Sequence, residues 1–188
     1  MRLLPFAAAA IVLAAPLSAQ QGPLRAPLST RVTFTLPLNP PRAEGAPAPA
    51  PLVVSIEYGQ PHARGRAVPA ELSTDGTVWR TGANSSTTLK TAADLVIGGT
   101  RIPAGAYSLY TIRENGAYKL IVNANTGQWG TSYEASRDVA RIPLRARTLH
   151  EAQESLQITM VPADAPTARG VLTIRWGTLE LAADWSTP

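Results

Sequence analysis

Short segments of alternating apolar and polar residues, separated by turn residues, are the feature that most restricts how this chain can fold. In 31–36 and again in 52–58, every second residue is apolar. This period of two is typical of a half-buried β-strand. Further strands are predicted at 77–81, 87–90, 94–97, 100–102, 107–112, 118–123, 139–144, 156–160, 172–176 and 179–185.

Two hairpin turns and the lack of long helical segments favour an antiparallel arrangement. Asn115-Gly116 and Gly98-Gly99 each lie between two predicted strands, and both pairs consist of residues that tolerate a positive φ. Only 149–154 could form a helical turn, whereas a parallel sheet needs crossovers of about a dozen residues. The sequence therefore predicts an all-β fold with little helix, a single antiparallel β-sandwich of roughly seven to ten strands with Greek-key or jelly-roll-like connections.

The first 19 residues have the features of a secretory signal peptide. A basic start, Met1-Arg2, precedes the apolar run 3–16, and a small residue stands at the expected cleavage point, Ala19. A membrane span needs about 20 apolar residues, more than this run has. We therefore expect export, to the periplasm or the extracellular space, and no transmembrane segment.

The remaining chain is predicted to form one domain. Residues 20–29 are expected to be a flexible lead-in to a β-domain at 30–188. The proline- and alanine-rich stretch 37–51 is predicted to be an insert in this domain, since proline lacks the N–H that a sheet ladder needs. The chain has no cysteine, which excludes disulfides, thiol catalysis and thiolate metal ligands.

The charged residues give little indication of a polyanionic partner. The chain carries 17 basic and 13 acidic side chains, a net charge of +4. Nucleic-acid-binding domains concentrate basic residues with aromatic ones, and here the charges are interspersed. The one basic run is interpreted as a solvated strand edge; it comprises Arg137, Arg141, Arg145 and Arg147.

The densest polar stretch is Val78–Asn84, followed closely by Thr87. It is interpreted as a strand that ends in a tight polar corner, with Gly82 or Asn84 at positive φ. Two readings remain open for it. Trp79 could lie in the core with Arg80 as a structural guanidinium, or Arg80, Asn84 and Thr87 could contact a ligand at the end of the sheet.

Other aromatic and basic residues are candidates for the same site. Trp79, Tyr58 and Trp129 are candidate walls, and Arg66 is a candidate polar contact. Trp129 lies in a long polar loop, 123–136, where it could form a platform for a sugar or could cap the core.

Several sequence blocks of this chain form a recognisable set. They are Glu57-Tyr58-Gly59-Gln60-Pro61, Arg64-Gly65-Arg66, Val78-Trp79-Arg80-Thr81-Gly82-Ala83-Asn84 with Thr87-Thr88, Ile97-Gly98-Gly99, Ile102-Pro103-Ala104-Gly105-Ala106-Tyr107-Ser108-Leu109 and Gln128-Trp129-Gly130. In these blocks the chain resembles the bacterial DUF2911 family of exported proteins of unknown function, from about residue 30 to its end. The resemblance implies an exported β-sandwich with no assigned activity. Many members have an acid after the Asn, where this chain has Ser85.

Catalytic motifs are not recognisable in the sequence. The two histidines, His62 and His150, have no metal-ligand spacing, and no Gly-x-Ser-x-Gly motif is present. We therefore expect no cofactor and no metal. The sequence favours a non-catalytic binding or cell-envelope interaction module, with a glycan, peptide or envelope component as partner. The alternatives are a hydrolase of envelope material and a purely structural or assembly protein.

Overall fold

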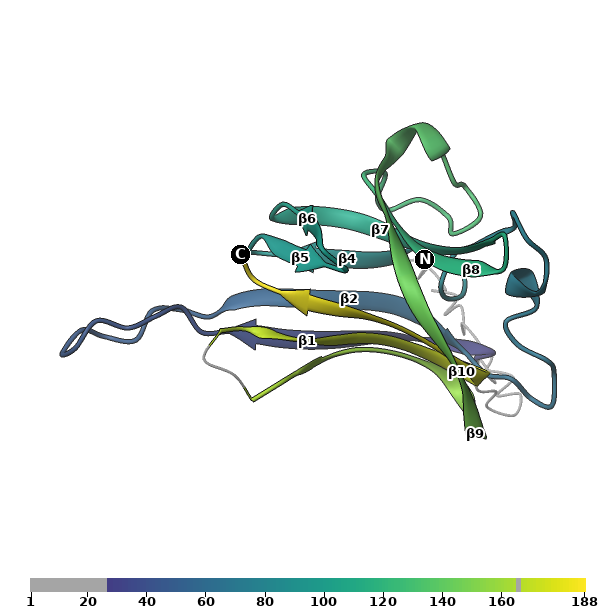
Figure 1. The fold of residues 1–188 in the computed structure, drawn as a ribbon, viewed down its shortest axis with the longest axis horizontal. Helices are drawn as coiled ribbons and strands as arrows, with labels where there is room; N and C mark the ends of the chain where they lie inside the picture. Colours follow the sequence, from purple (N-terminus) through teal and green to yellow (C-terminus); the bar gives the residue numbers. More distant parts are fainter. Residues whose placement is uncertain (1–26, 165–166) are drawn as a thin grey trace, which may run out of the picture.

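The computed structural model describes residues 27–164 and 167–188 of the chain (Figure 1). The predicted signal peptide and most of the predicted lead-in lie outside these residues. The described part contains ten strands and two short 3-10 helices, so the prediction of an all-β fold with little helix is confirmed. Among the described residues, no helix is long and apolar enough to cross a membrane.

The first half of the chain forms short strands joined by turns and one 3-10 helix. The elements are β1 (Ser29–Leu38), β2 (Leu52–Pro61), η1 (Ala70–Ser73), β3 (Val78–Trp79), β4 (Thr87–Thr91), β5 (Leu95–Ile97) and β6 (Thr100–Ile102). The proline-rich stretch connects β1 to β2, which pair in antiparallel register from Ser29 with Pro61 to Leu38 with Leu52. Gly98 and Gly99 have φ of 53° and 80° and close the predicted β5–β6 hairpin.

The second half contains the two longest strands of the sheet. It comprises β7 (Gly105–Glu114), β8 (Ala117–Asn123), η2 (Ala135–Arg137), β9 (Asp138–Pro162) and β10 (Arg169–Ser186). Asn115 and Gly116 form the predicted hairpin turn, both at positive φ. The stretch 149–154, which the sequence allowed as a helical turn, continues β9 instead.

All ten strands belong to one antiparallel sheet. Its order is β1-β2-β4-β7-β8-β9-β10-β5-β6, with β3 paired to β7. The predicted sandwich of two separate sheets is therefore not confirmed. The hydrogen-bonded ladder does not stop at a boundary between sheets, because the 25-residue β9 pairs with β8 through its first part and with β10 beyond it. In Figure 1, β9 leaves the level of β7 and β8 and reaches the level of β1 and β2.

The curled sheet encloses one main core. The buried side chains are the alternate apolar residues of nearly every strand, including Leu89, Leu120, Ile158 and Trp185. The distant strands β2 and β9 meet at one corner, where the Tyr58 hydroxyl accepts a hydrogen bond from the Ile158 amide at 3.3 Å. A second, smaller cluster lies around Tyr110 and Tyr133. The core thus holds β9 and β10 in place for the surfaces described next.

Candidate binding sites

The aromatic residue of the Val78–Asn84 corner lies in the core. Trp79 is 2% exposed and stacks on Trp176, with ring centroids 5.8 Å apart and planes 13° apart. Trp176 belongs to β10, nearly 100 positions further along the chain. Trp79 therefore joins β3 to β10, and it offers almost no surface to a ligand.

Hydroxyl groups of the same corner are satisfied inside the protein. Thr81 and Thr87 are fully buried. The Thr81 hydroxyl lies 2.8 Å from that of Thr111, and the Thr87 hydroxyl donates to the Thr81 carbonyl at 2.9 Å. The backbone turns sharply here, since Thr81 has φ 52° and Asn84 φ 63°. This confirms the predicted positive φ of Asn84 and accounts for Thr87 as a group that stabilises the turn.

A close backbone contact fixes the corner against β2. The Ala83 amide donates to the Gly59 carbonyl at 3.0 Å. A Cβ at Gly59 would lie 2.0 Å from the Ala83 carbonyl oxygen, so only glycine fits there. Because these buried polar groups are hydrogen-bonded, the free-energy cost of their desolvation is largely compensated, and the bonds stabilise a single local conformation.

Arg80 is half-buried at this corner, whereas Asn84 is exposed. Arg80 Nε donates to the Gly82 carbonyl at 3.2 Å, the one hydrogen bond that its guanidinium makes within the described residues. Its side chain lines a hollow of about 160 Å³ together with Glu71, Tyr110 and Tyr133. That volume is below the range of about 300–1,000 Å³ typical of small-molecule sites. The hollow has room for a small group only.

The phenol of Tyr133 is held protonated beside this hollow. Its hydroxyl donates to Asp138 Oδ2 at 2.7 Å and accepts from Arg141 Nη2 at 3.0 Å. Burial first, and then the hydrogen bond to the Asp138 carboxylate, raise the pKa of Tyr133 to about 12. Tyr133 is therefore a hydrogen-bond donor at neutral pH and is unsuited to act as a base.

A polar depression lies on the other side of the Trp129 loop. It has a volume of about 370 Å³, and we call it the hydroxyl depression. Its described lining residues are Arg31, Glu57, Ser85, Ser86, Thr88, Lys90, Ala106, Thr126 and Gly127. The buried Ser86 hydroxyl has no hydrogen-bond partner among the described residues. Arg31 Nε contacts Glu57 Oε1 at 2.9 Å.

Trp129 is 54% exposed and lies in the loop 123–136, of which Thr126 and Gly127, but not Trp129 itself, line the hydroxyl depression. Its backbone forms an isolated bridge with Ser85, a lining residue. The amide of the next residue, Gly130, donates to the Asn84 carbonyl at 2.9 Å. The structure thus brings together three of the sequence-predicted residues, Arg80, Asn84 and Trp129, around one loop, and it exposes the indole rather than packing it on the core.

The other two candidates, Tyr58 and Arg66, lie elsewhere. Tyr58 is buried, and burial raises the pKa of its phenol although the hydrogen bond from the Ile158 amide opposes the shift. Arg66 donates to the carbonyls of Ala63 and His62, at 3.0 and 2.8 Å. It therefore stabilises its own loop.

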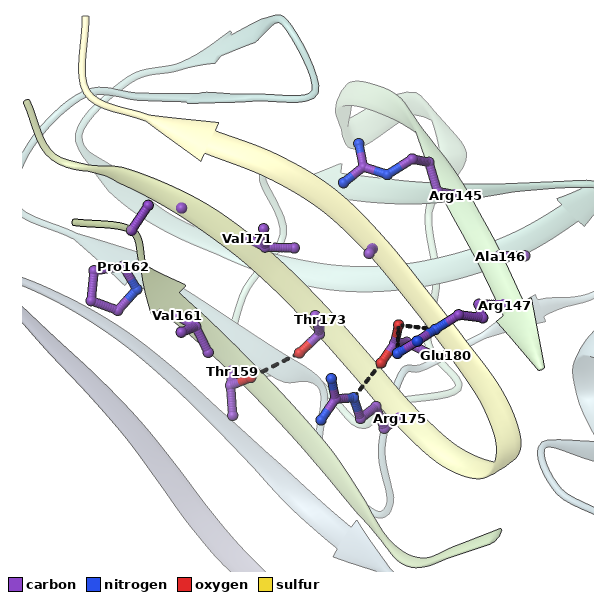
Figure 2. Close-up of a pocket in the computed structure, with 13 residues that line it drawn as sticks. Arg145, Ala146, Arg147, Thr159, Val161, Pro162, Val171, Thr173, Arg175 and Glu180 are labelled. Atoms are coloured by element: carbon purple, nitrogen blue, oxygen red, sulfur yellow. Dashed lines mark hydrogen bonds and ion pairs between the residues drawn. The ribbon is translucent and has the colours of Figure 1, made fainter. Parts of the chain in front are cut away.

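The largest hollow, about 690 Å³, was not predicted from the sequence; we call it the β9–β10 trough (Figure 2). Its charged residues, Arg145, Arg147, Arg175 and Glu180, belong to β9 and β10. Two of them belong to the arginine run that the sequence indicated as a solvated edge. The alternation of 172–176 could show that Arg175 faces outward, but it could not show what it faces.

A histidine and a serine meet where β2 joins β9. His62 Nδ1 lies 2.7 Å from Ser155 Oγ, and the two residues form an isolated bridge. Neither residue lines any of the hollows described above. Within the described residues, no group of three or more His, Asp or Glu could hold a metal ion. The geometry gives this pair a clear structural role, the fastening of two distant strands.

Comparison with known families supports the resemblance read from the sequence. The model of a protein family described as a protein of unknown function, DUF2911, matches residues 46–184. No curated protein and no solved structure matched the chain.

Proposed function

The chain belongs to the DUF2911 family, and we propose that it is an exported, non-catalytic protein that binds a glycan in the hydroxyl depression beside Trp129. The observation that carries this proposal is the exposed side chain of Trp129 on a loop whose backbone bridges Ser85, a residue that lines this polar hollow. An indole face is apolar and binds the C–H face of a sugar ring, while polar groups beside it bind the hydroxyls.

The composition of the depression supports a polyhydroxylated ligand. Sugar hydroxyls both donate and accept hydrogen bonds. Ser85 and Thr88 can do the same, Lys90 can donate, and the Glu57 carboxylate can accept. The volume of about 370 Å³ lies at the lower end of the range for small-ligand sites, about 300–1,000 Å³, and fits one or two sugar rings.

The same residues do not support glycoside hydrolysis at this place. Glycosidases use two carboxyl groups about 5–9.5 Å apart across the scissile bond. Glu57 is the one carboxylate among the described lining residues, and it pairs with Arg31 at 2.9 Å. Binding without hydrolysis is the function that fits this chemistry.

The proposal is tested by thermal shift and calorimetry with a panel of neutral and uronate-containing oligosaccharides. We expect at least one to raise the melting temperature, since a ligand at 100 times its Kd adds about 2.7 kcal/mol to the free energy of unfolding. Trp129→Ala should abolish this shift. Val139→Ala, at another exposed apolar residue, is the matched control and should keep it.

Two outcomes would contradict the proposal. One is a panel in which no oligosaccharide binds, and the other is a bound sugar whose affinity does not change in Trp129→Ala. Release of reducing ends during the incubation would favour the hydrolase alternative, because it reports cleavage of a glycosidic bond.

A further inference from the structure

We propose that the β9–β10 trough is a second binding site, which takes an amphiphilic carboxylate: a molecule with one anionic head group and an aliphatic chain. Four observations support this site. They are the shape of the trough, the distribution of its charged and aliphatic side chains, the guanidinium donors that it leaves open, and its size.

The trough exists because β10 folds back on itself. Gly177, at φ 59°, stands where the register with β9 shifts. A Cβ at this position would lie 2.6 Å from the Val68 carbonyl oxygen, so the bend requires glycine. The two ends of the strand meet again beyond it, where the Thr187 amide donates to the Ala168 carbonyl at 2.9 Å. Figure 2 shows the two legs of β10 side by side.

The side chains of the trough are sorted along its length. Figure 2 shows Arg147, Arg175 and Glu180 together at the bend of β10, and Val161, Pro162 and Val171 at the opposite end. Thr159 and Thr173 lie between them, with their hydroxyls 2.8 Å apart. One end is therefore charged and the other aliphatic, which matches the two parts of an amphiphile.

The charged end leaves hydrogen-bond donors for an anion. Glu180 has a side chain that is only 9% exposed, and it accepts from Arg175 Nε and Arg147 Nε. Arg175 uses only its Nε within the described residues, so both of its Nη groups remain open, and its side chain is 41% exposed. Two guanidiniums against one carboxylate leave one positive charge, and a guanidinium edge binds a carboxylate with two parallel hydrogen bonds.

The aliphatic end continues into a second hollow, of about 360 Å³, that shares Ala163, Gly170 and Val171 with the trough. Val96 and Trp185 also line it, and the charged residues Arg169 and Asp184 are among its lining residues. The trough itself, at about 690 Å³, has no aromatic residue among its described lining. This distinguishes it from a sugar platform and favours an alkyl chain, whose transfer out of water is favourable for each buried CH₂ group.

The proposal is tested by titrating the purified chain with decanoate, below its micelle concentration, in a calorimeter. We expect saturable binding, and binding about tenfold or more weaker for acetate, which lacks the chain, and for decanol, which lacks the charge. Arg175→Gln should weaken decanoate binding about tenfold or more. Arg101→Gln, at an exposed arginine of β6 that pairs with Asp94, should leave it unchanged.

A second variant keeps the test independent of the charged residues. Val171→Asn places a polar group at the aliphatic end and should also weaken decanoate binding, while circular dichroism checks that each variant is folded. The proposal is overturned if decanoate does not bind, if decanol binds equally well, or if folded Arg175→Gln and Val171→Asn both bind as the unchanged chain does. None of these results bears on glycan binding beside Trp129, because the two sites share no residue.

Discussion

The Val78–Asn84 corner, with the adjacent Thr87, and the β9–β10 trough are both rich in polar groups. They differ in whether those groups bond to other protein groups or remain open to a ligand. In the corner, Thr81 and Thr87 are fully buried and bonded to other protein groups. In the trough, Arg175 keeps its two Nη groups open beside a hollow of about 690 Å³. A polar group whose partners are all internal stabilises the fold, whereas a group with open donors can bind a ligand. Chemical density along the sequence does not separate these cases.

The largest expected effect tests the structural side of this comparison. Trp79→Ala removes a buried indole that stacks on Trp176 and should lower the free energy of unfolding by about 3–5 kcal/mol. Trp129→Ala is the matched control, since the same change at an indole that is 54% exposed should alter it by no more than about 0.5 kcal/mol. Urea denaturation followed by circular dichroism measures both. Equal losses in the two variants would break the comparison.

An intermediate effect is expected from the carboxylate of the trough. Burial alone would raise the pKa of the Glu180 carboxyl, but hydrogen bonds from Arg175 and Arg147 outweigh it and hold that pKa below its ordinary value of 4.5. A depressed pKa in the folded state means that Glu180 stabilises the fold above that ordinary value. This contribution is lost as the pH falls below 4.5 and through the lower pKa of the folded state.

Glu180→Gln should therefore lower the free energy of unfolding by about 1–3 kcal/mol at pH 7 and reduce its dependence on pH below that range. Glu57→Gln, whose ion pair with Arg31 is solvent-exposed, should change it by less than about 1 kcal/mol. Urea titrations at a series of pH values measure both variants. An unchanged acid dependence in Glu180→Gln would mean that the Arg147–Glu180–Arg175 cluster contributes nothing to stability.

Local sequence patterns are sufficient to predict most of the strands and their antiparallel pairing. The alternation of Val32, Phe34 and Leu36 and the two hairpin turns specify strands and their antiparallel pairing, because both depend on neighbouring residues. The length of β9 and β10 could not be predicted in the same way. The sequence indicated short strands with breaks, whereas the structure carries the ladder through bends such as the one at Gly177, which depends on contact with Val68.

The candidate sites depend on contacts between distant residues, and sequence reasoning reached them only in part. Trp129 was recognised as a candidate platform from its polar loop, but its neighbour Ser85 was not recognised as part of a hollow. Sequence reasoning did not predict the β9–β10 trough at all. Arg147 and Arg175 lie 28 positions apart, and both contact Glu180 only because β10 folds back. An alternating strand pattern shows which side chains face outward, but not which of them share a concave surface.

The smallest expected effect concerns Arg80, the residue that lies between the two sides of the comparison. Its guanidinium makes one hydrogen bond, to the Gly82 carbonyl, and lines a hollow of about 160 Å³. Arg80→Ala should therefore lower the free energy of unfolding by about 0.5–1.5 kcal/mol, the contribution of one such bond. Arg101→Ala, at an exposed ion pair with Asp94, should change the free energy of unfolding by about 0.5 kcal/mol or less.

A loss above about 3 kcal/mol in Arg80→Ala would place Arg80 with Trp79 among the groups that hold the corner together. A small loss combined with weaker oligosaccharide binding would instead place it with Trp129, because the Arg80 side chain packs against Gly130, the residue that follows Trp129.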